Sequence, residues 1–542
     1  MAEDSVSRRR FLGQSALAAL QAALFGPAFL GAKSPGRRPN IIFFITDDMY
    51  PDMFNFLPEG RGKNLTPNLD RLAHEGTVMM NQYVSSPVCT PSRYSCLTGR
   101  YASRARNQGF LRFTQKNDGQ TVVQWNTFVT PQDKILPHYL KELGYVTGMV
   151  GKNHVIEVKG LEHFANYYAD PADPEVAAKV KRNYNRVVTA IRRCGFDYAD
   201  GIYHNNPDYI GLWKLAVHNM DWITACGLRF IEQNRERPFF LYFATTVPHE
   251  PLEPERSWKA DRRLTPNGIL PEPPHVLPPP KTIPERLKKA GISMAGNRAN
   301  VLWLDDSLGA LLRKLEEHHL LDNTVIFFFN DHGQKAKGTL YQGGIHDPSV
   351  VWRKGGFPVG PVCRVRVSNI DFLPTIVDMA GGAVPGPEID GKSFRPVLEG
   401  RARQVHPALY FELGYSRAVI KGKWKYLAVR YPARLKNMSL AERRKILEEY
   451  NRRRILKRMP IVNTDPTKPF SHLSAIPGGG HAEFESTGKK PAYYDPDQLY
   501  DLESDPDELH NLAGKPEYRP VLRKMQQVLR EFLNRLPGKF DL

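Results

Sequence analysis

The fold class is decided by Ile41-Ile42-Phe43-Phe44-Ile45-Thr46-Asp47-Asp48, an apolar run that ends in two carboxylates. Five consecutive apolar residues without polar alternation are typical of a strand that is buried on both faces. In open α/β sheets, ligands bind beyond the carboxyl ends of the strands. The stretch therefore predicts a parallel strand with a binding site at its end.

Three further apolar runs end in the same way. They are residues 146–150, 239–243 and 325–329, which lead to Gly151-Lys152-Asn153-His154, to Pro248-His249 and to Asn330-Asp331-His332-Gly333. Helical patterns lie between the runs, at residues 67–74, 135–143 and 299–319. Strands that alternate with helices predict an α/β fold, with a large mixed, mostly parallel sheet between helices. The four polar strand ends should then converge on one edge of that sheet.

A targeting segment is expected before the main unit of residues 35–400. In residues 1–34, Ser7-Arg8-Arg9-Arg10-Phe11-Leu12 precedes an apolar run and resembles a twin-arginine export signal. It predicts a periplasmic or secreted protein. Polar residues interrupt the run, and no later stretch reaches the roughly 18 to 20 apolar residues of a membrane span. We therefore expect no stable membrane insertion, with an uncleaved anchor as the alternative.

Residues 401–542 predict a smaller α+β domain with a short antiparallel sheet and a terminal helix. Its expected strands lie within residues 410–412 and 418–429, and its last helix at 518–536. Ser439-Leu440-Ala441-Glu442 has the form of a capping box, which opens a basic helix that extends to about Arg458. In the main unit, the proline-rich residues 252–280 predict an extended surface insertion.

The net charge of +18 over 542 residues favours polyanionic partners, although solubility alone also explains it. Nucleic acid, anionic lipid and sulfated glycans all qualify by charge. No nucleic-acid recognition module is recognisable, so nucleic acid is not an expected partner. The five cysteines are few and irregularly spaced, which argues against a disulfide scaffold, although Cys194 and Cys226 could pair after export.

Three aspartates are candidates for a metal site. Asp47, Asp48 and Asp331 could supply carboxylate oxygens to one hard divalent cation. Adjacent carboxylates repel each other unless a cation or a proton intervenes. A single aspartate is more often a turn or a helix cap, but three at convergent strand ends favour a metal. His332 complicates the identity of the ion, because imidazole suits transition metals better than calcium.

Cys89 is the candidate nucleophile. It lies in Ser85-Ser86-Pro87-Val88-Cys89-Thr90-Pro91-Ser92-Arg93, before a helix that is expected from Pro91. A helix N-terminus stabilises negative charge, and Arg93, about one turn later, can reach the same point. This context predicts a reactive thiolate, with a small buried apolar side chain as the alternative.

The pentapeptide Cys89-Thr90-Pro91-Ser92-Arg93, followed by Leu97-Thr98-Gly99-Arg100-Tyr101, resembles the signature of the formylglycine-dependent (type I) sulfatases of the alkaline-phosphatase-like superfamily. The resemblance extends from about Pro39 to the C-terminus, outside the insertions. It includes residues 40–48, 151–154, 238–249, 337–344, 368–381, 390–394 and 499–506. It implies that residues 35–400 are a catalytic sulfatase domain. It also implies a partner, the formylglycine-generating enzyme, which oxidises Cys89 before folding.

The resemblance further implies a metal site and a set of catalytic groups. One Ca²⁺ ion is expected on Asp47, Asp48, Asp331, His332 and the formylglycine at position 89. Many family members carry Asn where this chain has His332, so another divalent metal stays open and Asn330 could contribute instead. The implied catalytic residues are Cys89, Arg93, Lys152, His154, His249 and Lys337.

Each implied role suits the breaking of a sulfate ester. Arg93 would stabilise the hydrated formylglycine, while Lys152 and Lys337 would hold sulfate oxygens on which negative charge develops. His249, with Lys337 as a second donor, would protonate the leaving alcohol. His154 would deprotonate the remaining hydroxyl group, so that sulfate leaves the enzyme.

The rest of the substrate would be recognised by insertions, and we expect a sulfated glycan. Candidate insertions are residues 108–132, 157–219 and 252–280, with His204, Asn205, Asn206 and Trp213 as candidate sugar contacts. Residues 421–460 hold fourteen Lys or Arg against three Glu, which predicts either a solvated helix face or a polysulfated-glycan patch. The alternatives are a phosphonate monoester or phosphodiester hydrolase with the same formylglycine site, and a non-catalytic polyanion-binding protein with Cys89 unmodified.

Overall fold

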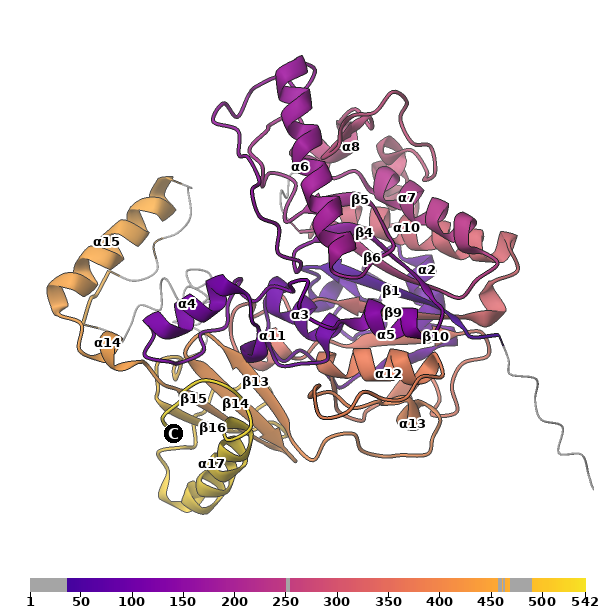
Figure 1. The fold of residues 1–542 in the computed structure, drawn as a ribbon. Coiled ribbons are helices and arrows are strands. Elements are labelled where there is room, and N and C mark those ends of the chain that lie inside the picture. Colours follow the sequence, from indigo (N-terminus) through magenta and orange to yellow (C-terminus); the bar gives the residue numbers. More distant parts are fainter. Residues whose placement is uncertain (1–36, 250–253, 457–460, 462–463, 468–489) are drawn as a thin grey trace, which may run out of the picture. The chain divides into compact units, whose positions relative to one another are not determined.

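The structure is a computed structural model that describes residues 37–249, 254–456, 461, 464–467 and 490–542. The expected signal peptide and the last two residues of the expected basic helix lie outside the described residues. Pro39–Leu542 form one compact unit (Figure 1). Among the described residues, no helix combines the length and apolar character needed to cross a bilayer.

In the described chain, eight strands form the central sheet, in the order β11-β2-β10-β9-β1-β6-β4-β5. Five parallel neighbours are β9 (Thr324–Asn330), β1 (Asn40–Asp47), β6 (Phe239–Pro248), β4 (Val146–Asn153) and β5 (Tyr198–His204). The others are β10 (Ser349–Arg353), antiparallel to β9, β2 (Thr77–Met79), antiparallel to β10, and β11 (Val362–Cys363), parallel to β2. The expected mixed, mostly parallel sheet is confirmed, and the four expected strands are adjacent at its centre.

The aromatic core explains why β1 is apolar along its whole length. Successive side chains of a strand point to opposite faces. On one face, Phe43 meets Phe372 edge-on, with 5.1 Å between the ring centroids. On the other face, Phe44 stacks on Phe243 at 4.9 Å and on Phe328 at 5.5 Å. Every residue of β1 is buried, so both faces are covered and favour apolar side chains.

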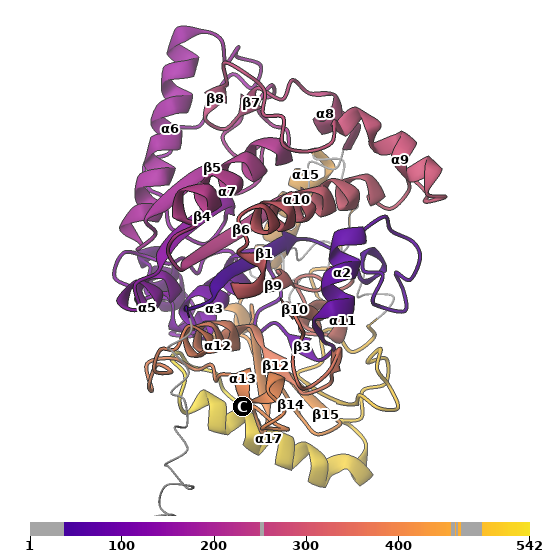
Figure 2. The same ribbon diagram turned by 90° about the vertical axis from the view of Figure 1, so that its right-hand side faces the viewer.

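Helices cover both faces of the sheet (Figure 2). One face carries α2 (Pro67–Glu75), α7 (Met220–Asn234) and α10 (Arg298–Glu317). The other carries α3 (Cys89–Thr98), α5 (Leu136–Glu142) and α12 (Phe372–Met379), and α6 (Pro174–Arg193) packs along β5. The three expected helices correspond to α2, α5 and α10, with ends that agree within two residues.

The C-terminal part forms a four-stranded antiparallel sheet of β13 (Leu409–Leu413), β14 (Ser416–Lys421), β15 (Trp424–Val429) and β16 (Asp497–Asp501). The terminal helix α17 (Arg519–Leu533) packs against β14 and β15. The expected small sheet and terminal helix are therefore confirmed, whereas the expected domain boundary near residue 400 stays a prediction.

The expected capping box is present at the start of α15 (Leu440–Leu456). Ser439 N donates to Glu442 Oε2 at 2.9 Å, and Glu442 N donates to Ser439 Oγ at 3.3 Å. Each of the two side chains thus accepts a hydrogen bond from a backbone N–H that has no partner within the helix.

Two expectations need correction. The proline-rich segment is not simply extended, because it contains α8 (Pro254–Lys259) and a hairpin of β7 (Leu264–Thr265) and β8 (Gly268–Ile269). Proline is compatible with the first turn of α8, where its missing N–H would be unpaired anyway.

Cys194 and Cys226 do not pair, since all five cysteines lie in the described part of the chain as buried free thiols.

The remaining elements are short. They are β3 (Gln82–Tyr83), β12 (Val367–Ser368), α4 (Gln108–Lys116), α9 (Ile283–Lys289), α11 (Gln342–Ile345), α13 (Arg395–Leu398), α14 (Ala433–Lys436) and 3-10 turns at Pro51–Met53, Ala102–Arg104, Pro280–Thr282, Leu321–Asn323, Asn369–Asp371 and Pro516–Tyr518.

Candidate active site

The four central strands place their polar ends at one edge of the sheet. Asp47 is the last residue of β1, and Lys152 is the penultimate residue of β4. His249 follows β6, and Asp331 and His332 follow β9. Because these strands are parallel neighbours, the residues meet as expected, although they are far apart in the sequence. Their chemical roles stay predictions.

Cys89 enters the site from a helix instead of a strand. The helix α3 begins at Cys89 itself, two residues earlier than expected, and this side chain is only 1% exposed. Its Sγ lies 3.5 Å from Asp47 Oδ1 and 3.5 Å from His332 Nε2. Burial, and then the charge of Asp331, raise the pKa of the Cys89 thiol well above its usual value. The unmodified thiol is therefore protonated here, and a reactive thiolate is not favoured.

Buried polar contacts hold α3 against the end of β9. Ser92 Oγ donates to Asp331 O, and Asn369 Nδ2 donates to Ser92 Oγ at 3.0 Å. The fully buried Arg93 donates from Nε to Asp331 Oδ2 at 3.1 Å, and its NH2 lies 3.5 Å from Asp47 Oδ1. Sequence reasoning identified Arg93 but missed Ser92 and Asn369, whose partners here lie 239 and 277 residues away.

Asp48 contacts three nitrogen-bearing side chains. It follows β1 in the left-handed backbone conformation, with φ of 64°. Lys337 Nζ lies 2.6 Å from both carboxylate oxygens, His332 Nε2 3.2 Å from Oδ1 and His249 Nε2 3.4 Å from Oδ2. Burial alone would raise the pKa of Asp48, but the charges of Lys337 and His249 outweigh it and lower the pKa well below its usual value. The carboxylate is therefore ionised.

The end of β4 contributes an ammonium group and, just beyond it, an imidazole. Lys152 Nζ contacts Asp47 Oδ2 and donates to Asn206 Oδ1 at 2.8 Å. Burial, and then the charge of Lys152, lower the pKa of His154 well below its usual value. Its Nδ1 has no hydrogen-bond partner among the described residues. A neutral imidazole with an unused nitrogen can accept a proton.

Two overlapping groups of side chains could hold a metal ion. They are Asp47, Asp48, Cys89 and His249, and Asp48, Cys89, Asp331 and His332, with the ligand atoms of each group within 4.8 Å of one another. Asp48 and Cys89 belong to both groups, and each group adds one carboxylate and one imidazole, so the donor set fits a divalent cation. Sequence reasoning had assigned His249 only to proton transfer.

Asn330 does not join these ligands. Its Oδ1 accepts hydrogen bonds from Thr46 Oγ1 at 3.1 Å and from Met49 N at 3.0 Å. The amide oxygen therefore connects β9 to the end of β1, and the suggestion that Asn330 binds the metal is not supported.

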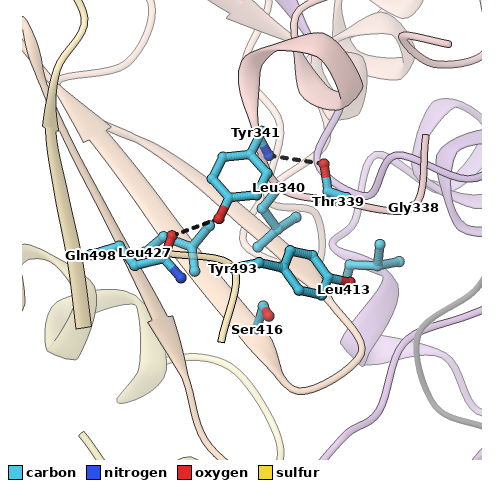
Figure 3. A pocket seen from close by; sticks show the side chains of 9 residues that line it. All are labelled: Gly338, Thr339, Leu340, Tyr341, Leu413, Ser416, Leu427, Tyr493 and Gln498. Carbon is cyan, nitrogen blue, oxygen red and sulfur yellow. Dashed lines mark hydrogen bonds between the residues drawn. The ribbon is translucent and has the colours of Figure 1, made fainter. Parts of the chain in front are cut away.

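Lys337 lies in a loop that the C-terminal sheet contacts. Gly338 N donates to Pro87 O at 3.1 Å, which links this loop to the segment before Cys89. A cavity of about 20 Å³ separates residues 338–341 from the sheet, and Tyr341 OH donates to Gln498 Oε1 at 2.9 Å (Figure 3). The cavity has room for about one water molecule, so it is too small for a substrate.

The candidate sugar contacts lie at the end of β5 and in the loop after it. Asn206 is engaged by Lys152, and His204 Nδ1 lies 3.3 Å from Asn153 Nδ2. Asn205 adopts the left-handed conformation of a turn, with φ of 62°. Trp213 is 40% exposed. Of the four residues, Trp213 has the most surface to offer a ligand.

Comparison with known proteins gives matches to the same family of enzymes. A family model described as Sulfatase matches residues 39–383. The chain is 27% identical over 431 residues to the N-acetylgalactosamine-6-sulfatase of Canis lupus familiaris. The aligned region covers 73% of each chain. It is 26% identical over 432 residues to the choline-sulfatase of Rhizobium meliloti (strain 1021), which covers 72% of this chain and 78% of that relative.

Solved structures share the fold. A Bacteroides thetaiotaomicron protein from a study of glycosaminoglycan metabolism aligns with a TM-score of 0.58 at 20% identity, over 92% of this chain and 99% of that one. A protein in complex with D-glucosamine-2-N,6-O-disulfate aligns at 0.54 and 19%, over 92% and 98%. The phosphonate monoester hydrolase of Silicibacter pomeroyi aligns at 0.53 and 17%, over 92% and 96%.

Proposed function

This chain belongs to the sulfatase family, and we propose that it removes sulfate from a sulfated glycan, with a formylglycine made from Cys89 and one divalent cation. Its family makes it a sulfuric ester hydrolase. The observation that carries the proposal is the position of Cys89, whose Sγ lies within 4.8 Å of the ligand atoms of Asp47, Asp48, Asp331 and His332.

The fixed charges of the site suit a sulfate ester. When bound, the cation would supply Lewis-acid stabilisation of sulfate oxygens, and the hydrated formylglycine a nucleophilic hydroxyl group. Lys152 and Lys337 provide positive charge where negative charge develops as the ester bond breaks. The carboxylates that they contact, Asp47 and Asp48, are also the expected metal ligands, so a loaded site would leave both ammonium groups for the substrate.

Two histidines suit the proton transfers. Burial, and then the charge of Lys152, lower the pKa of His249 to about 4, so its imidazole is neutral near pH 7 and still carries one N–H. The negative charge of a bound sulfate ester favours the imidazolium form of His249, which would give a proton to the leaving alcohol oxygen and return to the neutral imidazole, with Lys337 as a second donor. His154, also neutral, accepts the proton whose removal lets sulfate leave. A positioned general acid is typically worth ~10²–10⁴ in rate.

The charge of the chain and its relatives support a glycan as the substrate. The net charge is +18, and α15 exposes Arg444, Lys445, Arg452 and Arg453. One relative is named for N-acetylgalactosamine 6-sulfate, and one protein of the same fold was solved with a disulfated glucosamine. Sulfated sugars match both the charge and these names.

Calcium is the ion that the carboxylates favour, because Ca²⁺ prefers oxygen ligands. His332 is the one expected ligand that suits a transition metal better. Metal analysis of the purified protein distinguishes the two: stoichiometric calcium is expected, and a stoichiometric transition metal without calcium would contradict the choice.

Export by the twin-arginine pathway to the periplasm or beyond is proposed from Arg8, Arg9 and the apolar run that follows. That pathway carries folded proteins, so Cys89 would be modified before export.

Peptide mass spectrometry at position 89 tests the proposal. We expect the mass of formylglycine in place of cysteine, together with release of sulfate from an aryl sulfate. Cys89→Ala, which cannot be converted, should lose this activity by at least ~10³-fold, because it removes the nucleophile. An unmodified thiol in active enzyme from the native host would overturn the mechanism.

A phosphonate monoester or phosphodiester hydrolase is the second candidate, favoured by the fold shared with the Silicibacter pomeroyi enzyme. Rates on aryl sulfate and on a phosphodiester, measured side by side, separate the two activities. A non-catalytic polyanion-binding protein would leave the buried set of Lys152, His154 and His249 without a purpose.

A further inference from the structure

Two loops that begin at the catalytic edge lie side by side. One follows β4 and the other follows β5. Phe164 N donates to Ile210 O at 3.1 Å, and Trp213 N donates to Tyr167 O at 2.7 Å. The second loop contains Asn206, which contacts Lys152 in the site. The paired loops therefore extend from the catalytic edge to the protein surface that their later residues form.

Four aromatic rings lie on these loops, and all of them except the half-buried Tyr167 are exposed. We define the aromatic row as Tyr167, Tyr168, Tyr209 and Trp213. Tyr209 is 37% exposed, and its ring lies 5.0 Å from that of His204, at the end of β5. The ring of Trp213 packs against those of Tyr167 at 5.8 Å and Tyr168 at 6.2 Å, and Tyr168 is 75% exposed. Grouped exposed aromatic rings are typical of a binding surface.

A cation lies on this row. The guanidinium carbon of Arg256, in α8, lies 3.3 Å from the centroid of the Trp213 ring, and its NH2 contacts Trp213 O. Stacking on an indole holds a guanidinium in place through its attraction to the ring face. The surface at Trp213 is thus both apolar, through the aromatic ring, and positively charged, through Arg256.

The row rests on a packed base. Val180, Leu212 and Leu215 form a small buried cluster under the two loops, and Phe164 and Ile210 pack against it. A surface built on a packed base needs little reordering when a ligand binds, which favours affinity.

We propose that the aromatic row binds the sugar units next to the sulfated unit of an oligosaccharide, and that Arg256 binds a second sulfate group on them. This deepens the proposed function and rests on it. Pyranose rings present apolar C–H faces that pack on aromatic rings, while their hydroxyl groups stay in contact with water. A sulfate group supplies the anion that a stacked guanidinium binds.

Inhibition of aryl sulfate hydrolysis tests the row with defined probes. The probes are tetrasaccharides from heparin and from chondroitin sulfate, each compared with a monosulfated monosaccharide. In the wild type, at least one tetrasaccharide should inhibit about tenfold more tightly than the monosaccharide. Trp213→Ala and Tyr168→Ala should abolish this difference and leave kcat/KM for the aryl sulfate unchanged. Leu509→Ala, at an exposed apolar residue of the C-terminal part, should behave as the wild type.

Arg256→Gln separates charge from stacking. It should reduce the preference for the sulfated tetrasaccharide over its desulfated form, while stacking keeps part of the affinity. Equal inhibition by tetrasaccharides and monosaccharide in the wild type would overturn the proposal. So would tetrasaccharide affinities that the Trp213 and Tyr168 variants leave unchanged, which would point to a protein partner for this surface. If no aryl sulfate is hydrolysed, the proposed function fails instead, and calorimetric binding of the same tetrasaccharides still tests the row.

Discussion

His249 lies between charges of both signs where water has little access. Its side chain is 13% exposed, and Nε2 lies 3.4 Å from Asp48 Oδ2. Burial, and then Lys152, lower its pKa to about 4 against the attraction of Asp48. An unfolded histidine titrates near ~6.5. Between these values the unfolded chain binds a proton that the folded chain does not, so stability is complete above about pH 6.5 and falls as the pH drops toward about 4.

We predict that His249→Gln weakens this pH dependence in chelator-treated protein. Through His249 alone, the wild type should lose about 2 kcal/mol of unfolding free energy between about pH 7 and pH 5, and the variant should lose correspondingly less. Urea unfolding at the two pH values measures the difference. His510→Gln, at a side chain that is 78% exposed, is the matched control. If the unfolding free energies of His249→Gln and His510→Gln depend on pH in the same way, burial does not lower the pKa of His249.

At the residue scale, the sequence is sufficient to identify site residues whose neighbours in the chain form a recognisable pattern. Asp47 and Asp331 end apolar strands, and Cys89 lies in a short signature. Asn206 was chosen as a sugar contact, not as the partner of Lys152, and Ser92 was not chosen at all. Their contacts join residues 54 and 239 positions apart, so they depend on the packing of the whole fold.

At the scale of elements, sequence reasoning found the strands that are buried on both faces. It missed β5, a strand of mixed polarity that pairs with β4 at the edge of the sheet, and the two- and three-residue strands β11 and β2, which are too short for a pattern. It also missed α6, although the signals were present. Asp173 accepts a hydrogen bond from Glu175 N at 2.9 Å, and Pro174 occupies the first turn.

Gly151 shows how one residue sets the direction of a strand end. It has φ of 85°, and a Cβ at this position would overlap the carbonyl oxygen of Ala244 on β6. The register of β4 against β5 shifts between Met149 and Gly151, directly before Lys152. Such an irregularity redirects the side chains that follow it.

We predict that Gly151→Ala destabilises the protein by at least ~3 kcal/mol, through strain and overlap with β6, and lowers kcat by ~10²-fold through displacement of Lys152. Gly360→Ala is the control: φ is 90° there too, but no atom would lie within 4 Å of its Cβ, so only ~1 kcal/mol of strain is expected. Urea unfolding and steady-state kinetics provide the two measurements. Equal effects of the two substitutions would show that the contact with β6 is unimportant.

At the scale of the whole molecule, the C-terminal sheet contacts the catalytic edge through a buried ion pair. Lys425 of β15 and Glu508 are both fully buried and contact each other. Lys425 Nζ also contacts Leu340 O, and Glu508 Oε2 accepts a hydrogen bond from Gln342 N at 2.6 Å. Both backbone groups belong to the segment that follows Lys337, so the pair fixes the path of the chain beside a proposed catalytic residue.

We predict that Lys425→Met or Glu508→Gln alone costs ~3 kcal/mol or more, because each leaves a buried charge or carboxamide without its partner. The double variant Lys425→Met/Glu508→Gln should recover stability but not kcat, since the contact of Lys425 Nζ with Leu340 O, near Lys337, stays absent. Lys423→Met, at a half-exposed neighbour paired with Asp501, should cost less than ~1 kcal/mol. Full recovery of kcat in the double variant would show that the pair is structural only.

The burial of Cys89 has a consequence for the timing of synthesis. The pocket around its Sγ includes His332, which lies 243 residues later in the chain. A ribosome that adds ~5–20 residues per second needs about 12–50 s for that interval. During this time the nascent chain presents Cys89 without the strand that later covers it. Any enzyme that modifies this residue thus competes against translation, and slower elongation should raise the fraction of chains that are modified.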